Sequence, residues 1–121
     1  MMLTAEIKLK LPSANDYIEA CRRNRFQAAK LKEDTETAIM LFLRRLPKIE
    51  KPVKIEFVWT EDNRRRDLDN IAFGKKFILD ALVKARKLKD DNRRCVTGFS
   101  DTFEYGKTAK VTLKIREEEE E

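Results

Sequence analysis

Apolar residues alternate with polar ones in three stretches of the chain. Residues 3–11 have an apolar side chain at every second position and are followed by Pro12, and residues 53–60 and 107–116 repeat the pattern. Because successive side chains of a strand point to opposite faces of a sheet, this alternation predicts three strands, each with one buried face. Residues 94–100 predict a fourth strand with weaker alternation.

Helical periodicity follows the first strand. Residues 14–46 contain neither Gly nor Pro, begin after Ser13 as the N-cap, and stop at Pro47. Four apolar residues fall at i, i+3, i+4 and i+7, the spacing of one helix face: Ile39, Phe42, Leu43 and Leu46. A break in this long helix is expected near Asn24 or Asp34.

A second helix is predicted over residues 70–87, between a polar loop at 61–66 and a turn at 89–92. The order is then strand, helix, strand, helix, strand, strand. This order predicts an α+β fold, a two-layer sandwich of a four-stranded mixed sheet with two main helices on one face. The uncovered face, rich in lysine, is expected to be solvated or to bind a partner.

The length of 121 residues fits one domain, predicted over residues 1–116. Five glutamates at 117–121 predict a disordered acidic tail. The longest wholly apolar run, Ala38 to Leu43, has six residues, whereas a membrane helix needs about 20. No secretory signal pattern is visible, so a cytoplasmic protein without membrane contact is expected.

Composition excludes several chemistries. The chain has no histidine, which excludes Ser-His-Asp and Cys-His catalysis and histidine-ligated metal sites. It has two cysteines and no Cys-x-x-Cys motif, which argues against a disulfide scaffold or a thiolate zinc site.

The charge balance indicates a polyanionic partner. The net charge is +5, and leaving out the five terminal glutamates leaves 17 acidic against 27 basic residues over 1–116, a balance of +10. Such a basic surface on a small protein is typical of nucleic-acid binding. Many small basic proteins do not bind DNA specifically, and an acidic protein partner is an alternative.

Carboxylates gather around the second predicted helix. Asp67 and Asp69 lie two residues apart, between a strand end and a helix start, and Asp90 and Asp91 lie in the turn after that helix. Magnesium takes oxygen ligands and bridges carboxylates to substrate phosphate, so these residues are candidate ligands. The alternatives are that an aspartate caps the helix, worth about 1 kcal/mol, or that Asp90 and Asp91 only form the turn.

The segment from residue 64 to residue 91 contains a characteristic set of residues: Arg66-Asp67-Leu68-Asp69-Asn70, Lys76, Leu79-Asp80-Ala81-Leu82 and Asp90-Asp91. With these residues the segment resembles the RusA family of Holliday junction resolvases. Residues 13–32 are similar to the phage and prophage branch of the family. The resemblance implies a homodimer that cuts four-way DNA junctions symmetrically with magnesium or manganese, in recombination and repair.

The resemblance also implies roles for individual residues. Asp67, Asp69 and Asp91 match the metal-binding aspartates. Lys76 matches the catalytic lysine when residues are counted back from Asp80, whereas counting forward from Asp69 reaches Phe73, which cannot serve as the lysine. Lys75 is the second candidate. The predicted DNA-binding residues beside this site are Arg64, Arg65, Arg66 and Lys75.

A second basic run lies in the first predicted helix. Residues 22–32 hold five basic residues and no acidic one. Arg22, Arg23 and Arg25 are predicted to contact a second DNA arm, with a solvated helix face as the alternative. Phe26 lies within the run and is interpreted as a core residue, with insertion between DNA bases as the alternative.

The sequence thus predicts a Mg²⁺-dependent crossover junction endodeoxyribonuclease. Its predicted catalytic residues are Asp67, Asp69, Asp91 and Lys76. Two alternatives remain: a structure-selective DNA-binding protein without catalysis, and a nuclease for other branched or flap DNA.

Overall fold

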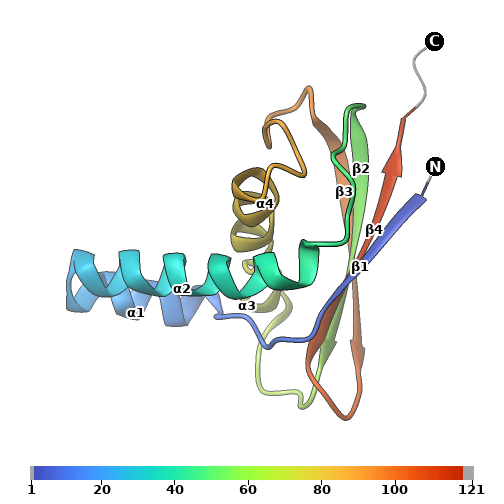
Figure 1. Ribbon diagram of the computed structural model, residues 1–121. Coiled ribbons are helices and arrows are strands. Elements are labelled where there is room, and N and C mark those ends of the chain that lie inside the picture. The colour runs from blue at the N-terminus through green and yellow to red at the C-terminus, as the bar shows by residue number, and fades with distance from the viewer. Residues whose placement is uncertain (1, 119–121) are drawn as a thin grey trace.

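A computed structural model describes residues 2–118, which form one four-stranded sheet with helices on one face (Figure 1). The strands are β1 (Met2–Ile7), β2 (Val53–Glu61), β3 (Val96–Tyr105) and β4 (Lys110–Glu117). Their order across the sheet is β1-β4-β2-β3, in which β2 and β3 are parallel and the other pairs are antiparallel. The predicted α+β class and mixed sheet are confirmed.

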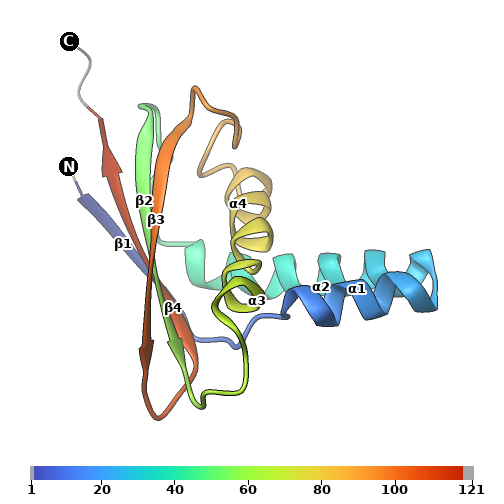
Figure 2. The ribbon, with the colours of Figure 1, turned by 180° about the vertical axis from the view of Figure 1, so that it is seen from behind.

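Each of the two predicted helices is divided in two, and all four segments lie on the same side of the sheet (Figure 2). They are α1 (Ala14–Arg23), α2 (Arg25–Leu43), α3 (Leu68–Ala72) and α4 (Lys75–Lys84). The first break lies at Asn24, one of the two expected positions. The Asn24 side chain accepts a hydrogen bond from the backbone N–H of Gln27 at 2.9 Å, so it caps a new helix there.

The prediction of one continuous helix over residues 70–87 was wrong. The chain leaves the α-helical pattern at Gly74, whose N–H donates to the carbonyl of Ile71, three residues back. A Cβ at Gly74 would lie 3.1 Å from Leu11 Cδ1 and 3.2 Å from Trp59 Cζ3. Glycine therefore allows the backbone to approach the sheet closely at the point where α3 gives way to α4.

The core lies between the sheet and the helices. On β2, Val53, Ile55, Phe57 and Trp59 are at most 2% exposed, and the predicted inward residues of the last strand are also buried. From the other layer α4 contributes Phe77, Ile78, Ala81 and Leu82. Each large apolar side chain buried in this way stabilises the fold by about 1.5–3 kcal/mol.

The strand boundaries differ from the sequence prediction at both edges of the sheet. β1 ends at Ile7, four residues before Leu11, and β3 extends to Tyr105 rather than residue 100. As an edge strand, β3 leaves most side chains partly exposed, so its sequence lacks a clear alternation. The predicted disordered acidic tail is ordered at its start, because Glu117 is the last residue of β4 and the Glu118 N–H donates to the Pro52 carbonyl. Residues 119–121 of this tail lie outside the described residues.

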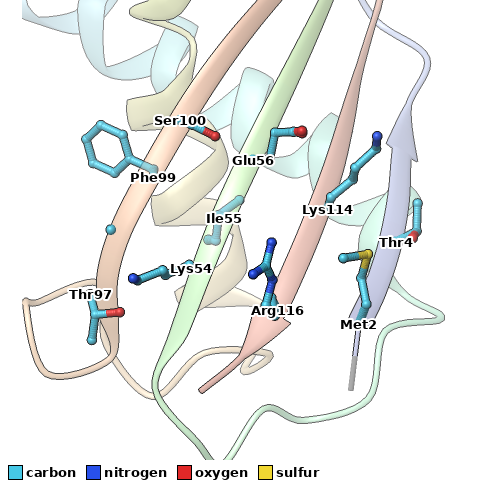
Figure 3. Close-up of a pocket in the computed structure, with 11 residues that line it drawn as sticks. Met2, Thr4, Lys54, Ile55, Glu56, Thr97, Phe99, Ser100, Lys114 and Arg116 are labelled. Atoms are coloured by element: carbon cyan, nitrogen blue, oxygen red, sulfur yellow. The ribbon is translucent and has the colours of Figure 1, made fainter. Parts of the chain in front are cut away.

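The face of the sheet without helices carries a shallow groove lined from all four strands (Figure 3). Three of its lining residues are cations and one is an acid: Lys54, Lys114, Arg116 and Glu56. This face is polar, as its sequence indicated. Within residues 2–118 no helix combines the length and apolar character needed to cross a bilayer.

Candidate active site

The loop between β2 and α3 is fastened to the body of the protein on both sides. Arg66 Nη1 donates to the carbonyl of Leu11 at 2.9 Å, and Arg66 Nε lies 3.3 Å from Oε1 of the buried Glu61. At the start of the loop, Lys10 Nζ donates to Asp62 Oδ1 at 2.7 Å, which lowers the pKa of Asp62. These contacts fix the backbone that leads into Asp67.

Asp67 and Asp69 follow this loop with exposed carboxylates. Asp67 occupies the N-cap position of α3, yet its side chain makes no capping hydrogen bond. Among the described residues, Asp69 Oδ1 accepts a single hydrogen bond, from the neighbouring N–H of Asn70 at 3.0 Å. Neither carboxylate has a lysine or arginine nitrogen within 4.0 Å in the part of the chain that is described. The capping alternative therefore fails for Asp67, and both side chains are available to an external cation.

The turn after α4 gives its two aspartates different roles. Asp90 accepts from the backbone N–H of Asp91 at 2.7 Å and from Nδ2 of Asn92 at 3.1 Å. Asn92 Oδ1 in turn accepts from two backbone N–H groups, those of Arg94 and Cys95. Asp90 and Asn92 therefore form the turn, whereas the Asp91 carboxylate makes no hydrogen bond or ion pair to another residue between positions 2 and 118.

The three predicted metal ligands do not meet within one chain. The segment 67–69 opens α3, which leads into the first turn of α4, and the turn that carries Asp91 follows the last turn of α4. The two ends of α4 lie apart along the sheet (Figures 1 and 2). The ten residues of α4 span about 15 Å. Residues 2–118 contain no group of three or more Cys, Asp or Glu side chains placed to hold a metal ion. A magnesium site built from all three aspartates of a single chain does not fit.

The two candidate lysines occupy different environments. Lys75 is predominantly buried: its Nζ lies 2.7 Å from Asp101 Oδ2 and 3.9 Å from the centre of the Phe99 ring. Trp59 Nε1 donates to the other oxygen of Asp101 at 2.8 Å. The sequence missed this network because the strand predicted over residues 94–100 stopped one position before Asp101.

Lys76 has a side chain 60% exposed, and its Nζ lies 3.5 Å from Asp80 Oδ1. The count back from Asp80 that selects Lys76 stays within α4 and does not cross the break at Gly74, so Lys76 remains the predicted catalytic lysine. What distinguishes Lys76 from Lys75 in the structure is its accessibility to solvent.

The predicted DNA-binding residues fall into two separate groups. Arg64, whose guanidinium lies 4.3 Å from the centre of the Tyr105 ring, and the exposed Arg65 lie beside the aspartate pair. The second group lies at the far end of the α1–α2 pair: Arg22, Arg23 and Arg25 (Figure 1). The charged groups of Arg66 and Lys75 are engaged within the chain by Glu61 and Asp101, so DNA contact by these two residues stays a prediction.

The comparison with known protein families shows to which family this chain belongs. A family model described as Endodeoxyribonuclease RusA matches residues 7–116. The chain belongs to the RusA endodeoxyribonuclease family. The match extends the resemblance of residues 64–91 to nearly the whole chain and supports nuclease activity on branched DNA of the Holliday junction type. RusA nucleases generally depend on a divalent metal ion. A comparison with curated proteins finds no similar sequence.

Proposed function

We propose that this RusA family member resolves four-way DNA junctions by paired symmetric cleavage, as a Mg²⁺-dependent homodimer acting in recombination and repair. The observation that carries the proposal is the pair of exposed carboxylates of Asp67 and Asp69, which have no cationic partner within residues 2–118. They follow a loop that Arg66 fastens to the sheet, and Arg64 and Arg65 lie on the same loop.

The residues of one chain offer a partial metal site. Mg²⁺ is commonly bound by one or two carboxylates together with substrate phosphates, and Asp67 and Asp69 supply two. Such an ion activates water and neutralises charge on a phosphoryl group; Mn²⁺ is a chemically similar substitute. Arg64 and Arg65 bind the DNA backbone beside the pair. Lys76 is the proposed catalytic lysine, because Lys75 is held by Asp101.

A homodimer gives Asp91 a place in this proposal. Since α4 separates Asp91 from Asp67 and Asp69 in one chain, Asp91 of the partner subunit is the one that completes a three-aspartate site. Mixing Asp67→Asn and Asp91→Asn variants tests this. Mixed dimers then contain one site with all three aspartates and regain part of the cutting activity, whereas sites confined to single chains give no recovery.

The direct test uses a labelled synthetic four-way junction, a flap substrate and a linear duplex, each with and without Mg²⁺. We expect paired nicks in the junction only, and only with the metal. Asp67→Asn and Asp69→Asn are expected to abolish cutting while junction binding remains. Asp34→Asn, an exposed aspartate on α2, is the matched control and is expected to cut normally.

Three results would contradict parts of the proposal. Binding without any cutting by the wild type supports the non-catalytic alternative, and preferential cutting of the flap supports the other-substrate alternative. For the lysine, single-turnover cleavage at saturating enzyme is compared in Lys76→Ala and Lys75→Ala. A loss of about 10²-fold is expected for Lys76→Ala, the scale for one transition-state donor. A slower Lys75→Ala variant contradicts the assignment.

A further inference from the structure

The α1–α2 pair extends well beyond the sheet as an arm, defined here as residues 14–35 (Figures 1 and 2). α1 buries none of its residues, and three of the four buried residues of α2 lie outside the arm: Glu36, Ile39 and Leu43. From Arg25 to Glu36 the helix advances about 16 Å. The outer end of the arm is therefore held by α1 and α2 alone.

The base of the arm is firmly attached. The Tyr17 ring lies 5.7 Å from the Phe73 ring and 6.0 Å from the Phe77 ring, so α1 packs on the helices that follow β2. Glu36, which is fully buried, pairs with Lys84 of α4 and with Lys32 at 2.9 Å. The arm thus has a fixed direction relative to the loop that carries the aspartate pair.

The tip of the arm presents an aromatic ring to water. Phe26 is the second residue of α2 and is 80% exposed, so its interpretation as a core residue was wrong. The Asn24 cap starts α2 immediately before it and fixes the backbone that carries the ring. A phenylalanine at this position adds nothing to the core, and its apolar surface is stabilised when a partner buries it.

Positive charge surrounds this ring. Residues 20–32 include five cations and no acidic residue. Arg23 pairs with Glu19 at 3.0 Å, but both side chains are about two-thirds exposed and the pair is easily exchanged. Arg22, Arg25 and Lys30 have no carboxylate oxygen within 4.0 Å in the described part of the chain. The tip therefore combines an aromatic surface with unneutralised positive charge.

This combination suits nucleic acid better than a second copy of the chain. A two-fold symmetric contact would bring the arginines of one tip against the same arginines of the other, which is repulsive. Phosphates neutralise arginines, and an aromatic ring stacks on a base or enters a base step. In a continuous duplex every step is stacked, whereas at a branch point stacking is interrupted and a ring is admitted at lower cost.

We propose that the arm tip recognises the branch point of DNA: Phe26 stacks on a base exposed there, and Arg22 and Arg25 bind the flanking phosphates. This inference rests on the proposed junction substrate, and it assigns selectivity for branched DNA to a surface separate from Asp67 and Asp69.

The test measures binding in chelator, where no cutting occurs. A four-way junction carries 2-aminopurine beside the branch point, and a linear duplex of the same arm sequence is the reference. Phe26→Ala is expected to weaken junction binding about 5- to 150-fold, the equivalent of about 1–3 kcal/mol for one stacked base, and to leave duplex binding within about twofold. The fluorescence change on binding is lost with Phe26→Ala and retained with Phe26→Trp.

Two controls separate stacking from general effects. Leu41→Ala removes another exposed apolar side chain, 62% exposed near the opposite end of α2, and is expected to change neither affinity. Arg22→Ala and Arg25→Ala are expected to weaken both DNA forms and to reduce the salt slope by about one each. Circular dichroism checks that each variant is folded.

The inference is overturned if Phe26→Ala binds the junction as the wild type does, or weakens junction and duplex equally. It is also overturned if all three tip variants leave both DNA affinities unchanged, the result expected for an acidic protein partner. The binding test involves no cleavage, so the two proposals fail separately. If the wild type does not cut the junction, only the proposed function is contradicted. If the wild type cuts the junction and Phe26→Ala binds it with unchanged affinity, only this inference is contradicted.

Discussion

Replacing Arg66 with methionine separates a structural role from a DNA-binding role. Arg66 donates to the Leu11 carbonyl and lies 3.3 Å from Glu61 Oε1, in a pair whose side chains are only 17% and 7% exposed. Removing one partner of a buried ion pair costs about 3–5 kcal/mol, because the other charge stays buried without compensation. Since Arg66 is partly exposed, we expect the lower part of this range, about 3 kcal/mol.

Urea denaturation measures this effect. A domain of this size has an m value of about 1.5–2 kcal/mol per molar urea, so the midpoint should fall by about 1.5–2 M in Arg66→Met. Arg65→Met, the exposed neighbour, is the matched control and should change stability by less than about 0.5 kcal/mol.

A second substitution identifies the cause. Adding Glu61→Leu to Arg66→Met removes the uncompensated carboxylate and should restore much of the lost stability. If Arg66→Met is as stable as Arg65→Met and differs from the wild type only in DNA affinity, the structural assignment is refuted and Arg66 returns to the DNA-binding group.

Three further predictions concern other charged groups. Asp67→Asn and Asp69→Asn should change the urea-unfolding free energy by less than about 0.5 kcal/mol in chelator, because neither carboxylate has a cationic partner among residues 2–118; a clear loss indicates a structural role. Lys75→Met should destabilise the protein by about 1–3 kcal/mol through loss of the Asp101 pair, and Lys76→Met by less than about 0.5 kcal/mol; equal effects contradict the assignment of environments. Hydrogen bonding to Glu36 raises the pKa of Lys32 above its ordinary value of 10.5. The wild type should therefore be more stable than Lys32→Met below pH 10.5, and this difference should disappear as the pH rises through the raised pKa. A stability difference that does not change with pH in alkaline melting experiments contradicts this prediction.

The predictability of the fold followed the clarity of each pattern. β2 and β4 are buried on one face, so alternation located them to within a few residues. β3 is an edge strand, and its alternation is too weak to mark its end at Tyr105. At the break, Gly74 lies close to Trp59 and Leu11, which are distant in sequence. The periodicity of residues 70–87 alone could therefore not predict it.

The candidate site was predicted in its residue types and only partly in its geometry. Asp67 and Asp69 are neighbours in sequence, and the structure keeps both exposed at the start of α3. Asp91 is separated from them by a helix whose direction relative to the loop depends on the whole fold. The exposure of Phe26 could not be predicted from the sequence either. An amphipathic pattern does not show where a helix extends beyond the sheet and the helices packed on it.

The position of β4 between β1 and β2 bears on how the protein folds during its synthesis. Among the described strands β1 pairs with β4 alone, and Met2 lies opposite Arg116. At about 5–20 residues per second, the ribosome completes β4 roughly 5–20 s after β1. Until then β1 has no strand partner, and β2 has only one of its two neighbours. The emerging chain therefore carries Asp67 and Asp69 before the sheet that supports their loop exists, and the ability to cut DNA should arise in one late, cooperative step.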